Sequence, residues 1–459
     1  MKIRILIAIL MFVPLCGAWG QSMVTGVPSV VSDTTIVRYW KSDISVVYVR
    51  DRGNNKSFML VDEASPTVLK IAVPAAMSVS DFRILNDTVY FGGYVVNAMG
   101  NKRGLLALFA LQDFYNGAGS YNWADVQSGV MLDIVGGCFS NQIVEVTRLA
   151  VYDDVQAGPQ IAYIGRNYIT DETLIRVGIG WATYYGGVWQ THIIYNKYAE
   201  EEYTDIIATE NYVVAAARTN TLARLALRIF PKSSFLTWTF SWYYYYPDKY
   251  GQGFADLEVD ENVMAAALDG DEFAVAYHYV SGTTEGLALK TFGISGSVAT
   301  LTQGLNAPVA HQAGSVWKMR DVRYSPSLKR LTVLNDFDGG TAGSLSSIVY
   351  QFHLPTLATG TYYGRYLTGY RLQALDGYGA AADRFAAAGS VLGGGMLSMY
   401  SEFLNSPASC GQPDEIKCST VTASPYTTFM ETNMNLPDTK KGSEPFVVEG
   451  MGKSLICSQ

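Results

Sequence analysis

The sequence predicts an all-β fold and, within that class, a β-propeller. A short pattern of alternating apolar and polar residues recurs six times along the 459 residues. Strand-forming residues are abundant, with 31 tyrosines and 13% aromatic residues, while only 16% of the residues are charged. Recurrence of one unit of several strands is the signature of a propeller, in which each unit is a blade that cannot bury its faces alone.

The pattern occurs at residues 79–84, 145–149, 203–208, 254–259, 319–324 and 371–375. Its third position holds Asp81, Thr147, Asp205, Asp256, Asp321 and Gln373. These positions are 51 to 66 residues apart, whereas a four-stranded blade needs roughly 40 to 50 residues. We therefore expect insertions of uneven length between the strands.

Period-2 alternation predicts two further strands after most of the repeats. The second strands are expected at 88–95, 160–165, 212–217, 331–334 and 384–388, and the third at 104–111, 173–180, 221–230, 346–354 and 396–403. Four strands at 34–39, 44–50, 57–61 and 68–73 make one more blade ahead of the repeats. The favoured architecture is a propeller of seven blades over residues 21–404, with six or eight blades as alternatives.

The unit that contains Asp256 aligns less cleanly than the others. Residues 262–268 and 273–280 read as a hairpin across the turn Asp269-Gly270-Asp271. Segment 254–259 is then either the first strand of this blade or the last strand of the blade before it, and the sequence leaves both options open.

The N-terminus predicts an exported protein. Lys2 and Arg4 precede an apolar run at 5–15, and Ala18-Trp19-Gly20 forms a small-x-small cleavage signal, so residues 1–20 are expected to be a signal peptide. Cys16 raises a lipoprotein alternative, but a large leucine precedes it, and simple cleavage is favoured. The expected location is the periplasm, the cell surface or the extracellular space, with no transmembrane segment in the mature chain.

The charge balance argues against nucleic acid as a partner. The chain has 33 basic and 41 acidic residues, a net charge of −8, and it becomes more acidic once Lys2 and Arg4 are removed. Nucleic-acid binding depends on neutralising phosphates with clustered Lys and Arg, and the sequence contains no such run.

Residues 405–459 differ from the rest in composition and are expected to form a tail held across the propeller. Four cysteines remain after cleavage: Cys138, Cys410, Cys418 and Cys457. An even number in an exported protein suggests disulfides, with three possible pairings; free buried thiols are the alternative. At least one bridge within the tail is expected.

One stretch resembles a known group of proteins. Residues 80–93, which read SDFRILNDTVYFGG, and residues 104–109, which read GLLALF, are similar to blades of uncharacterised secreted β-propeller proteins of Gram-negative bacteria. The resemblance implies a propeller fold and an export route. It implies no activity and no functional residue.

Searches for catalytic motifs identify no catalytic residue. There is no HExxH, no G-x-S-x-G and no complete phosphate loop. The recurring aspartates Asp81, Asp205, Asp256 and Asp321 have two interpretations. They form a ring at the channel mouth that binds a cation, or they accept backbone hydrogen bonds at tight turns and stabilise each blade; the structural interpretation is favoured.

Calcium is the one cofactor for which the sequence offers candidate ligands. Asp336 and Asp338 lie in a D-x-D-G segment, and Asp269 and Asp271 lie in a second carboxylate-rich turn. Neither segment has the complete ligand set of a calcium loop, and both also fit ordinary hairpin turns.

Aromatic residues beside turns are the candidate ligand-binding surface. Tyr243 and Tyr245 alternate with a run of larger rings and lie close to Tyr250, and Tyr184, Tyr185 and Trp189 surround a Gly-Gly pair. Exposed flat rings can stack on the apolar faces of sugars, and packing in the core is the alternative for each of them.

These observations favour a non-catalytic binding or scaffold propeller whose partner is a carbohydrate or a surface protein. Two alternatives stay open: a glycan-active hydrolase or lyase with its site at the channel mouth, and a structural component of a surface assembly that uses the tail as its contact element. Whether the chain is an enzyme, and its oligomeric state, are left undecided.

Overall fold

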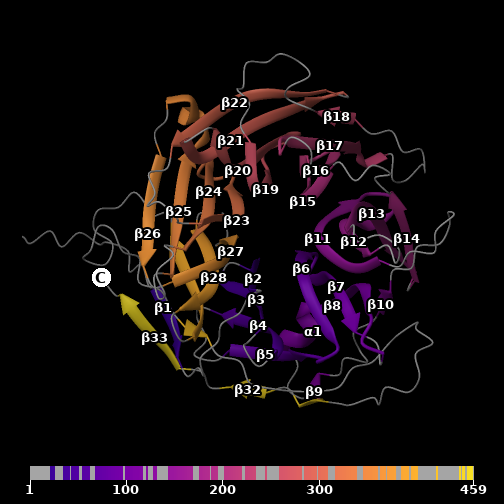
Figure 1. The fold of residues 1–459 in the computed structure, drawn as a ribbon. Helices are drawn as coiled ribbons and strands as arrows, with labels where there is room; N and C mark the ends of the chain where they lie inside the picture. The colour runs from indigo at the N-terminus through magenta and orange to yellow at the C-terminus, as the bar shows by residue number, and fades with distance from the viewer. Residues whose placement is uncertain are drawn as a thin grey trace, which may run out of the picture.

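The computed structural model is almost entirely β-structure, arranged as a ring of sheets around a central axis (Figure 1). The description covers residues 21–25 and most of 35–457. It does not extend to residues 1–20, 26–34, 132–142, 234–242, 246–257, 309–315, 402–419, 422–443 and 458–459, or to shorter stretches between strands. The predicted all-β propeller fold is confirmed.

The described residues form seven antiparallel sheets of four or five strands, which follow one another along the chain. The first contains β2 (Thr35–Lys41), β3 (Ile44–Arg50), β4 (Lys56–Asp62) and β5 (Val68–Val73). The second contains β6 (Met77–Leu85), β7 (Thr88–Val96), β8 (Lys102–Ala110) and β10 (Ser128–Met131). The third contains β11 (Ile143–Asp154), β12 (Gly158–Tyr168), β13 (Ile175–Tyr185) and β14 (Val188–Ile194).

The other four sheets repeat this meander. They are β15 (Glu201–Ala208), β16 (Tyr212–Thr219), β17 (Leu225–Pro231) and β18 (Tyr243–Tyr245); β19 (Glu258–Ala267), β20 (Glu272–Ser281), β21 (Thr284–Ser295) and β22 (Val298–Pro308); β23 (Val316–Ser325), β24 (Arg330–Asp338), β25 (Leu345–His353) and β26 (Tyr362–Thr368); and β27 (Tyr370–Tyr378), β28 (Arg384–Val391), β29 (Gly394–Ser401) and β30 (Thr420–Val421).

Short helical segments also lie within the described residues, among them α1 (Leu111–Asn116) and the 3-10 helix η3 (Leu354–Thr359). Among these residues, no helix combines the length and the apolar character needed to cross a bilayer.

The first strand of each sheet lies nearest the axis (Figure 1). These strands, β2, β6, β11, β15, β19, β23 and β27, pack against one another in chain order, and β27 packs against β2. The last sheet therefore meets the first, and the ring closes. Closure protects strand edges that an open array of sheets would expose.

The hydrophobic core lies between neighbouring sheets. Between the first and second sheets, the ring of Phe58 contacts those of Phe82, Phe91 and Phe109, with centroids 5.3, 5.7 and 5.2 Å apart. Similar apolar clusters lie between other neighbouring sheets, and one that includes Val37 joins the first sheet to the last. Burial of these faces holds each blade against the next.

The repeated pattern corresponds to a β-bulge in the innermost strand. The pairing of β6 with β7 shifts between Val79 and Asp81, and the same shift occurs before Asp205 and Asp321. A bulge inserts one residue into a strand and re-aims its side chain. The residue left unpaired by the shift comes directly before the aspartate, and the aspartate is the first residue paired after it.

The alignment of the fifth unit at Asp256 was wrong. The hairpin across Asp269–Asp271 is present, and its first strand, β19, is the innermost strand of that sheet. The backbone N–H of Ala265 in β19 bonds to the preceding sheet's aspartate, as do those of Leu149 and Leu375, which directly follow the first paired residue after the shift in their strands. The residue of β19 equivalent to the aspartates is thus Met264, and Asp256 lies outside the described residues.

Short strands of the C-terminal tail pair with edges of the propeller. β32 (Val447–Glu449) joins β5, β31 (Glu444–Pro445) joins β9 (Ser120–Tyr121), and β33 (Gly452–Cys457) joins β1 (Gln21–Thr25). The pairing of β1 with β33 places Cys457 opposite Gln21. Cys138, Cys410 and Cys418 lie outside the described residues, so the disulfides stay a prediction.

Candidate functional site

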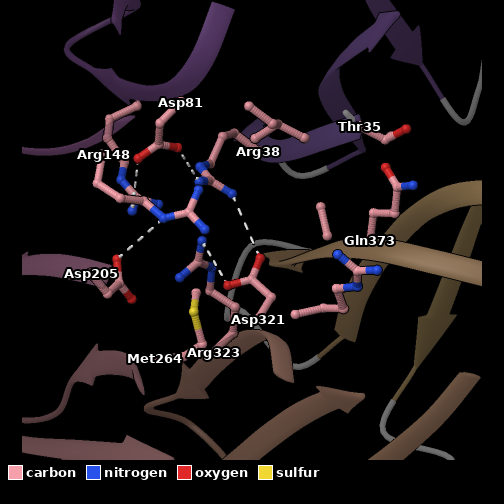
Figure 2. A pocket seen from close by; sticks show the side chains of 13 residues that line it. Thr35, Arg38, Asp81, Arg148, Asp205, Met264, Asp321, Arg323 and Gln373 are labelled. Carbon is pink, nitrogen blue, oxygen red and sulfur yellow. Dashed lines mark hydrogen bonds and ion pairs between the residues drawn. The ribbon is translucent and has the colours of Figure 1, made fainter. Parts of the chain in front are cut away.

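The innermost strands of all seven sheets line one cavity on the axis, with a volume of about 40 Å³ (Figure 2). Such a volume exceeds what a single buried water needs. The polar part of its lining consists of five arginines, three aspartates, a threonine and a glutamine: Arg38, Arg83, Arg148, Arg320, Arg323, Asp81, Asp205, Asp321, Thr35 and Gln373.

Asp81 is the most tightly held carboxylate of this cavity. Its side chain is fully buried, its Oδ1 lies 2.7 Å from Nη2 of Arg38, and its Oδ2 lies 3.3 Å from Nη2 of Arg83. The backbone N–H groups of Phe82 and Leu149 donate to the same carboxylate, each at 2.9 Å. Because Leu149 belongs to β11, Asp81 links the second sheet to the third.

Asp321 repeats this arrangement on the other side of the ring. Its Oδ1 lies 3.2 Å from Nη2 of Arg323, and its Oδ2 accepts a hydrogen bond of 3.0 Å from the N–H of Leu375 in the next sheet. Arg38 also approaches it, with Nη1 4.0 Å from Oδ2. Two of the three buried carboxylates thus have close guanidinium partners.

Asp205 is held differently. The backbone N–H groups of Ile206 and Ala265 each donate to it at 2.9 Å. Its nearest cation is Arg148, whose Nε lies 3.9 Å from Oδ1, beyond hydrogen-bonding distance. Figure 2 shows Arg148 between the carboxylates of Asp81 and Asp205. Asp205 is therefore the least compensated carboxylate of the three.

The pKa values of these groups follow their partners. Burial alone raises the pKa of Asp81, but the charges of Arg83, Arg38 and Arg148 outweigh it, and the net pKa is lowered. For Asp205, burial outweighs the more distant arginines and the pKa is raised. Burial, together with Arg83 and Arg323, lowers the pKa of Arg38 to about 10. Arg38 is thus repelled by neighbouring arginines as well as paired with Asp81.

Several of the arginines also bind the backbone of the following sheet. The Nε of Arg38 donates to the carbonyl of Phe82, that of Arg83 to the carbonyl of Leu149 and that of Arg323 to the carbonyl of Leu375. Arg38 and Arg323 use all three of their nitrogens in hydrogen bonds or ion pairs. Their guanidinium groups therefore link neighbouring sheets through hydrogen bonds.

Arg148 and Arg320 are used less fully. Within the part of the chain that the structure describes, Arg148 bonds through Nε alone, to the carbonyl of Thr204 at 3.3 Å and toward Asp205. Arg320 bonds through Nη2 to Asp336 at 2.6 Å, while its buried Nε has no hydrogen-bond partner there. These two arginines come from the third and sixth sheets, on opposite sides of the axis.

The cavity carries an excess of positive charge. Its five arginines face three aspartates, an excess of two. With the flanking Arg371, Asp336 and Asp376 included, six cations face five anions, and one positive charge is left over. This positive centre lies inside a chain whose net charge is −8.

The favoured interpretation of the recurring aspartates was that they accept backbone hydrogen bonds at tight turns. The hydrogen bonds are present, but the predicted donors were wrong. Asp81, Asp205 and Asp321 do accept backbone hydrogen bonds, but one of these bonds comes from the next sheet rather than from a tight turn. The channel-mouth cation ring is contradicted, because guanidinium groups already lie beside these carboxylates.

The D-x-D-G segment is also placed differently from the prediction. Asp336 and Asp338 lie within β24 rather than in a loop or turn. Asp336 is buried, and its Oδ2 accepts from Arg320 and from Arg371 at 2.7 Å. Asp336 is thus the counter-ion of two arginines, and the side chain of Asp338 lies outside the description.

The second carboxylate segment is a turn, as expected, and both of its carboxylates are engaged. Asp269 accepts from Lys329 and from the hydroxyl of Tyr324. Asp271 accepts from the backbone N–H and the side-chain amide of Asn211 at 2.7 and 2.8 Å. Among the described residues, no three His, Cys, Asp or Glu side chains gather as a metal would require.

The aromatic residues around Gly186 differ in how far they are exposed to solvent. Trp189 is buried, with 8% of its surface exposed, and its ring lies 5.3 Å from that of Tyr184. Tyr184 packs against the same cluster, whereas Tyr185 is 67% exposed. Trp189 is therefore part of the core, and Tyr185 is the ring of this group that a ligand can reach.

The other aromatic candidates are only partly placed. Tyr243 and Tyr245 lie in β18, the outermost strand of the fourth sheet, which pairs with β17. Their side chains and the whole of Tyr250 lie outside the described residues, and their role in binding stays a prediction.

We expect Tyr185→Ala and Trp189→Ala, two changes in one hairpin, to differ sharply in stability. Loss of the buried Trp189 ring should lower the free energy of unfolding by about 3–5 kcal/mol, while loss of the exposed Tyr185 ring should change it by less than about 0.5 kcal/mol. Urea unfolding followed by tryptophan fluorescence and circular dichroism measures both. Equal effects would contradict this division of the group.

Comparisons with known proteins identify no family for this chain. No family model and no curated protein matches the chain. Solved structures similar to it include an ulvan lyase of polysaccharide lyase family PL25, also solved bound to GlcA(1-4)Rha3S, at 10% identity and a TM-score of 0.45, with 84% of this chain and 95% of that chain covered. Another is the BP39L lectin from Burkholderia pseudomallei, at 10% identity and a TM-score of 0.48, with 82% and 97% covered. Similarity at this level carries no argument about what this chain binds.

Proposed function

We propose that this chain is a non-catalytic binding propeller that takes an anionic group of its ligand into the axial cavity. The observation that carries the proposal is the excess of arginine over aspartate in a cavity lined by every sheet of the ring. Arg148 and Arg320 retain N–H groups that the described residues do not use. A bound anion satisfies such donors through charge-assisted hydrogen bonds.

The anionic group is a single carboxylate. A planar guanidinium matches a carboxylate in bidentate geometry, and a cavity of about 40 Å³ leaves little room for more than one small group. The net charge of −8 repels polyanions at long range. These features favour a ligand with one negative charge, such as an acidic sugar, consistent with the carbohydrate partner that the aromatic residues suggest.

The direct test is isothermal titration calorimetry of the purified protein with D-glucuronate, and with D-glucose as the neutral counterpart. We expect glucuronate to bind and glucose to bind at least about tenfold more weakly, because charged hydrogen bonds contribute roughly 1.5–3 kcal/mol. Sulfate and phosphate, run in parallel, distinguish a carboxylate site from a general anion site.

Arg148→Met is the informative variant for this test. It removes the guanidinium but keeps a long side chain, and Met264 already occupies the equivalent place in β19, one residue after the bulge position. Glucuronate affinity should fall at least about tenfold. Lys329→Ala removes the same charge at an exposed turn and should leave affinity unchanged. Absence of glucuronate binding to the wild-type protein, or equal loss in both variants, overturns the proposal.

A glycan-active enzyme is the second candidate, and one observation favours it. Asp205 is a buried carboxyl on the cavity wall whose pKa burial raises, with Arg148 beside it. Raised carboxyl pKa values are typical of groups that donate protons in catalysis. Turnover of an acidic polysaccharide that disappears in Asp205→Asn, while binding is retained, would establish this function in place of simple binding.

A further inference from the structure

The three buried aspartates of the axis differ in how firmly their arginines hold them. Asp81 has guanidinium nitrogens at 2.7 and 3.3 Å, and Asp321 has one at 3.2 Å. Asp205 has its nearest at 3.9 Å, and its strong hydrogen bonds come instead from the backbone. Backbone hydrogen bonds therefore hold its carboxylate in place, and no guanidinium lies close enough to pair with it tightly.

Arg148, the arginine nearest to Asp205, is itself only partly engaged. Its side chain keeps 31% of its surface exposed, more than the other arginines of the cavity whose ion pairs are described. Its terminal nitrogens have no hydrogen-bond partner among the described residues. An incoming carboxylate that reaches these nitrogens comes close to the charge of Asp205.

We propose that Asp205 competes with the ligand's carboxylate for Arg148, so that protonation of Asp205 opens the site and the propeller binds its anionic ligand more tightly as the pH falls. This inference rests on the proposed function, because it names the group that regulates the same cavity. The negative charge of Asp205 repels a neighbouring carboxylate, and a neutral Asp205 does not.

The surroundings of Asp205 set the direction of the effect. The charges that act on it are Arg148 of β11, Arg83 of β6 and Arg323 of β23, while β16 faces it with Ala216 and β19 with the N–H of Ala265. Burial outweighs these arginines and raises the pKa of Asp205 above its ordinary value of 3.8. On acidification Asp205 therefore takes up its proton at a higher pH than an ordinary aspartate does, and affinity for a ligand carboxylate that is still charged rises.

Asp205→Thr isolates this group. The equivalent positions of β11 and β27, the first paired residue after the register shift, hold Arg148 and Ala374, so the ring accommodates a residue without a carboxylate there. The variant should bind D-glucuronate at about pH 8 more tightly than the wild type does, and it should lose most of the wild type's pH dependence. Asp205→Asn, which keeps an acceptor for one of the two backbone N–H groups, is the second variant in case the first does not fold.

The experiment is calorimetric titration with D-glucuronate at about pH 5 and about pH 8 for the wild type, Asp205→Thr and the surface control Asp153→Asn. We expect tighter binding at the lower pH for the wild type and the control, by up to roughly tenfold, the effect of removing one unit charge close to the ligand. A pH-independent wild-type affinity overturns this inference and leaves the proposed function standing. No binding at either pH overturns the proposed function itself.

Discussion

Asp81→Ala is expected to lower the free energy of unfolding by about 3–5 kcal/mol, because it leaves the buried Arg38 without its closest counter-charge. Arg38 has only 7% of its side chain exposed, and Asp81 lies 2.7 Å away. The same change removes an acceptor from the N–H of Leu149 and so a link between the second and third sheets. Urea unfolding at neutral pH measures the loss.

This loss should depend on pH in one direction. The folded protein holds the pKa of Asp81 below its ordinary value. The contribution of the ionised carboxylate is therefore complete above its unfolded pKa of about 3.9 and disappears as the pH falls through the lower folded value. The difference between wild type and Asp81→Ala should shrink below about pH 4.

The control for this prediction is an exposed aspartate. Asp153 accepts a hydrogen bond from Asn86 at the surface, and Asp153→Ala should change stability by less than about 0.5 kcal/mol. Equal losses for Asp81→Ala and Asp153→Ala would show that the axial ion pairs do not hold the blades together.

The second large effect is expected for Gly93→Ala, at about 3 kcal/mol or more. Gly93 pairs with Val79 beside the bulge of β6, and a Cβ there would fall well inside van der Waals contact of the Ser78 carbonyl oxygen. Because the obstacle is backbone of the paired strand, relief requires β6 and β7 to separate. Gly389 lies against the Arg371 carbonyl in the same way at the bulge of β27.

Gly293→Ala is the matched control, since a Cβ at this strand position would meet Thr302 Cγ2 at 3.6 Å, an ordinary contact. Its effect on the urea midpoint should be small. A Gly93→Ala protein as stable as Gly293→Ala would contradict the tight bulge geometry that the repeat imposes on the innermost strand.

The sequence was sufficient for the architecture because strand periodicity and the repeat are local signals. The repeat proved to mark a β-bulge of the innermost strand. Asp81, Asp205 and Asp321 are each the first residue paired after the register shift, which explains why they recur with the same backbone partners. The match at Asp256 was wrong because Met264 occupies the place of the aspartates in β19. An apolar residue there carries none of the polar signal on which the alignment relied.

The axial cavity could not be predicted, because it depends on which way residues far apart in the chain face. The signal that pointed to it was an arginine two residues after the aspartate, in the pairs Asp81 with Arg83 and Asp321 with Arg323. Arg148 and Arg38 follow no such rule and became visible only once the ring closed. The D-x-D-G segment was wrongly predicted as a calcium loop or a turn. The sequence around Asp336 does not show its partners, because Arg320 and Arg371 lie in neighbouring strands.

Binding in the axial cavity is tested most directly by a crystal structure of the protein soaked with D-glucuronate. We expect density for the sugar carboxylate in the axial cavity, within hydrogen-bonding distance of the terminal nitrogens of Arg148, with Arg38 and Arg323 still bound to their aspartates. An empty cavity in crystals that bind the sugar elsewhere, for example beside Tyr185, would contradict binding at the axis and favour the aromatic surface as the ligand site.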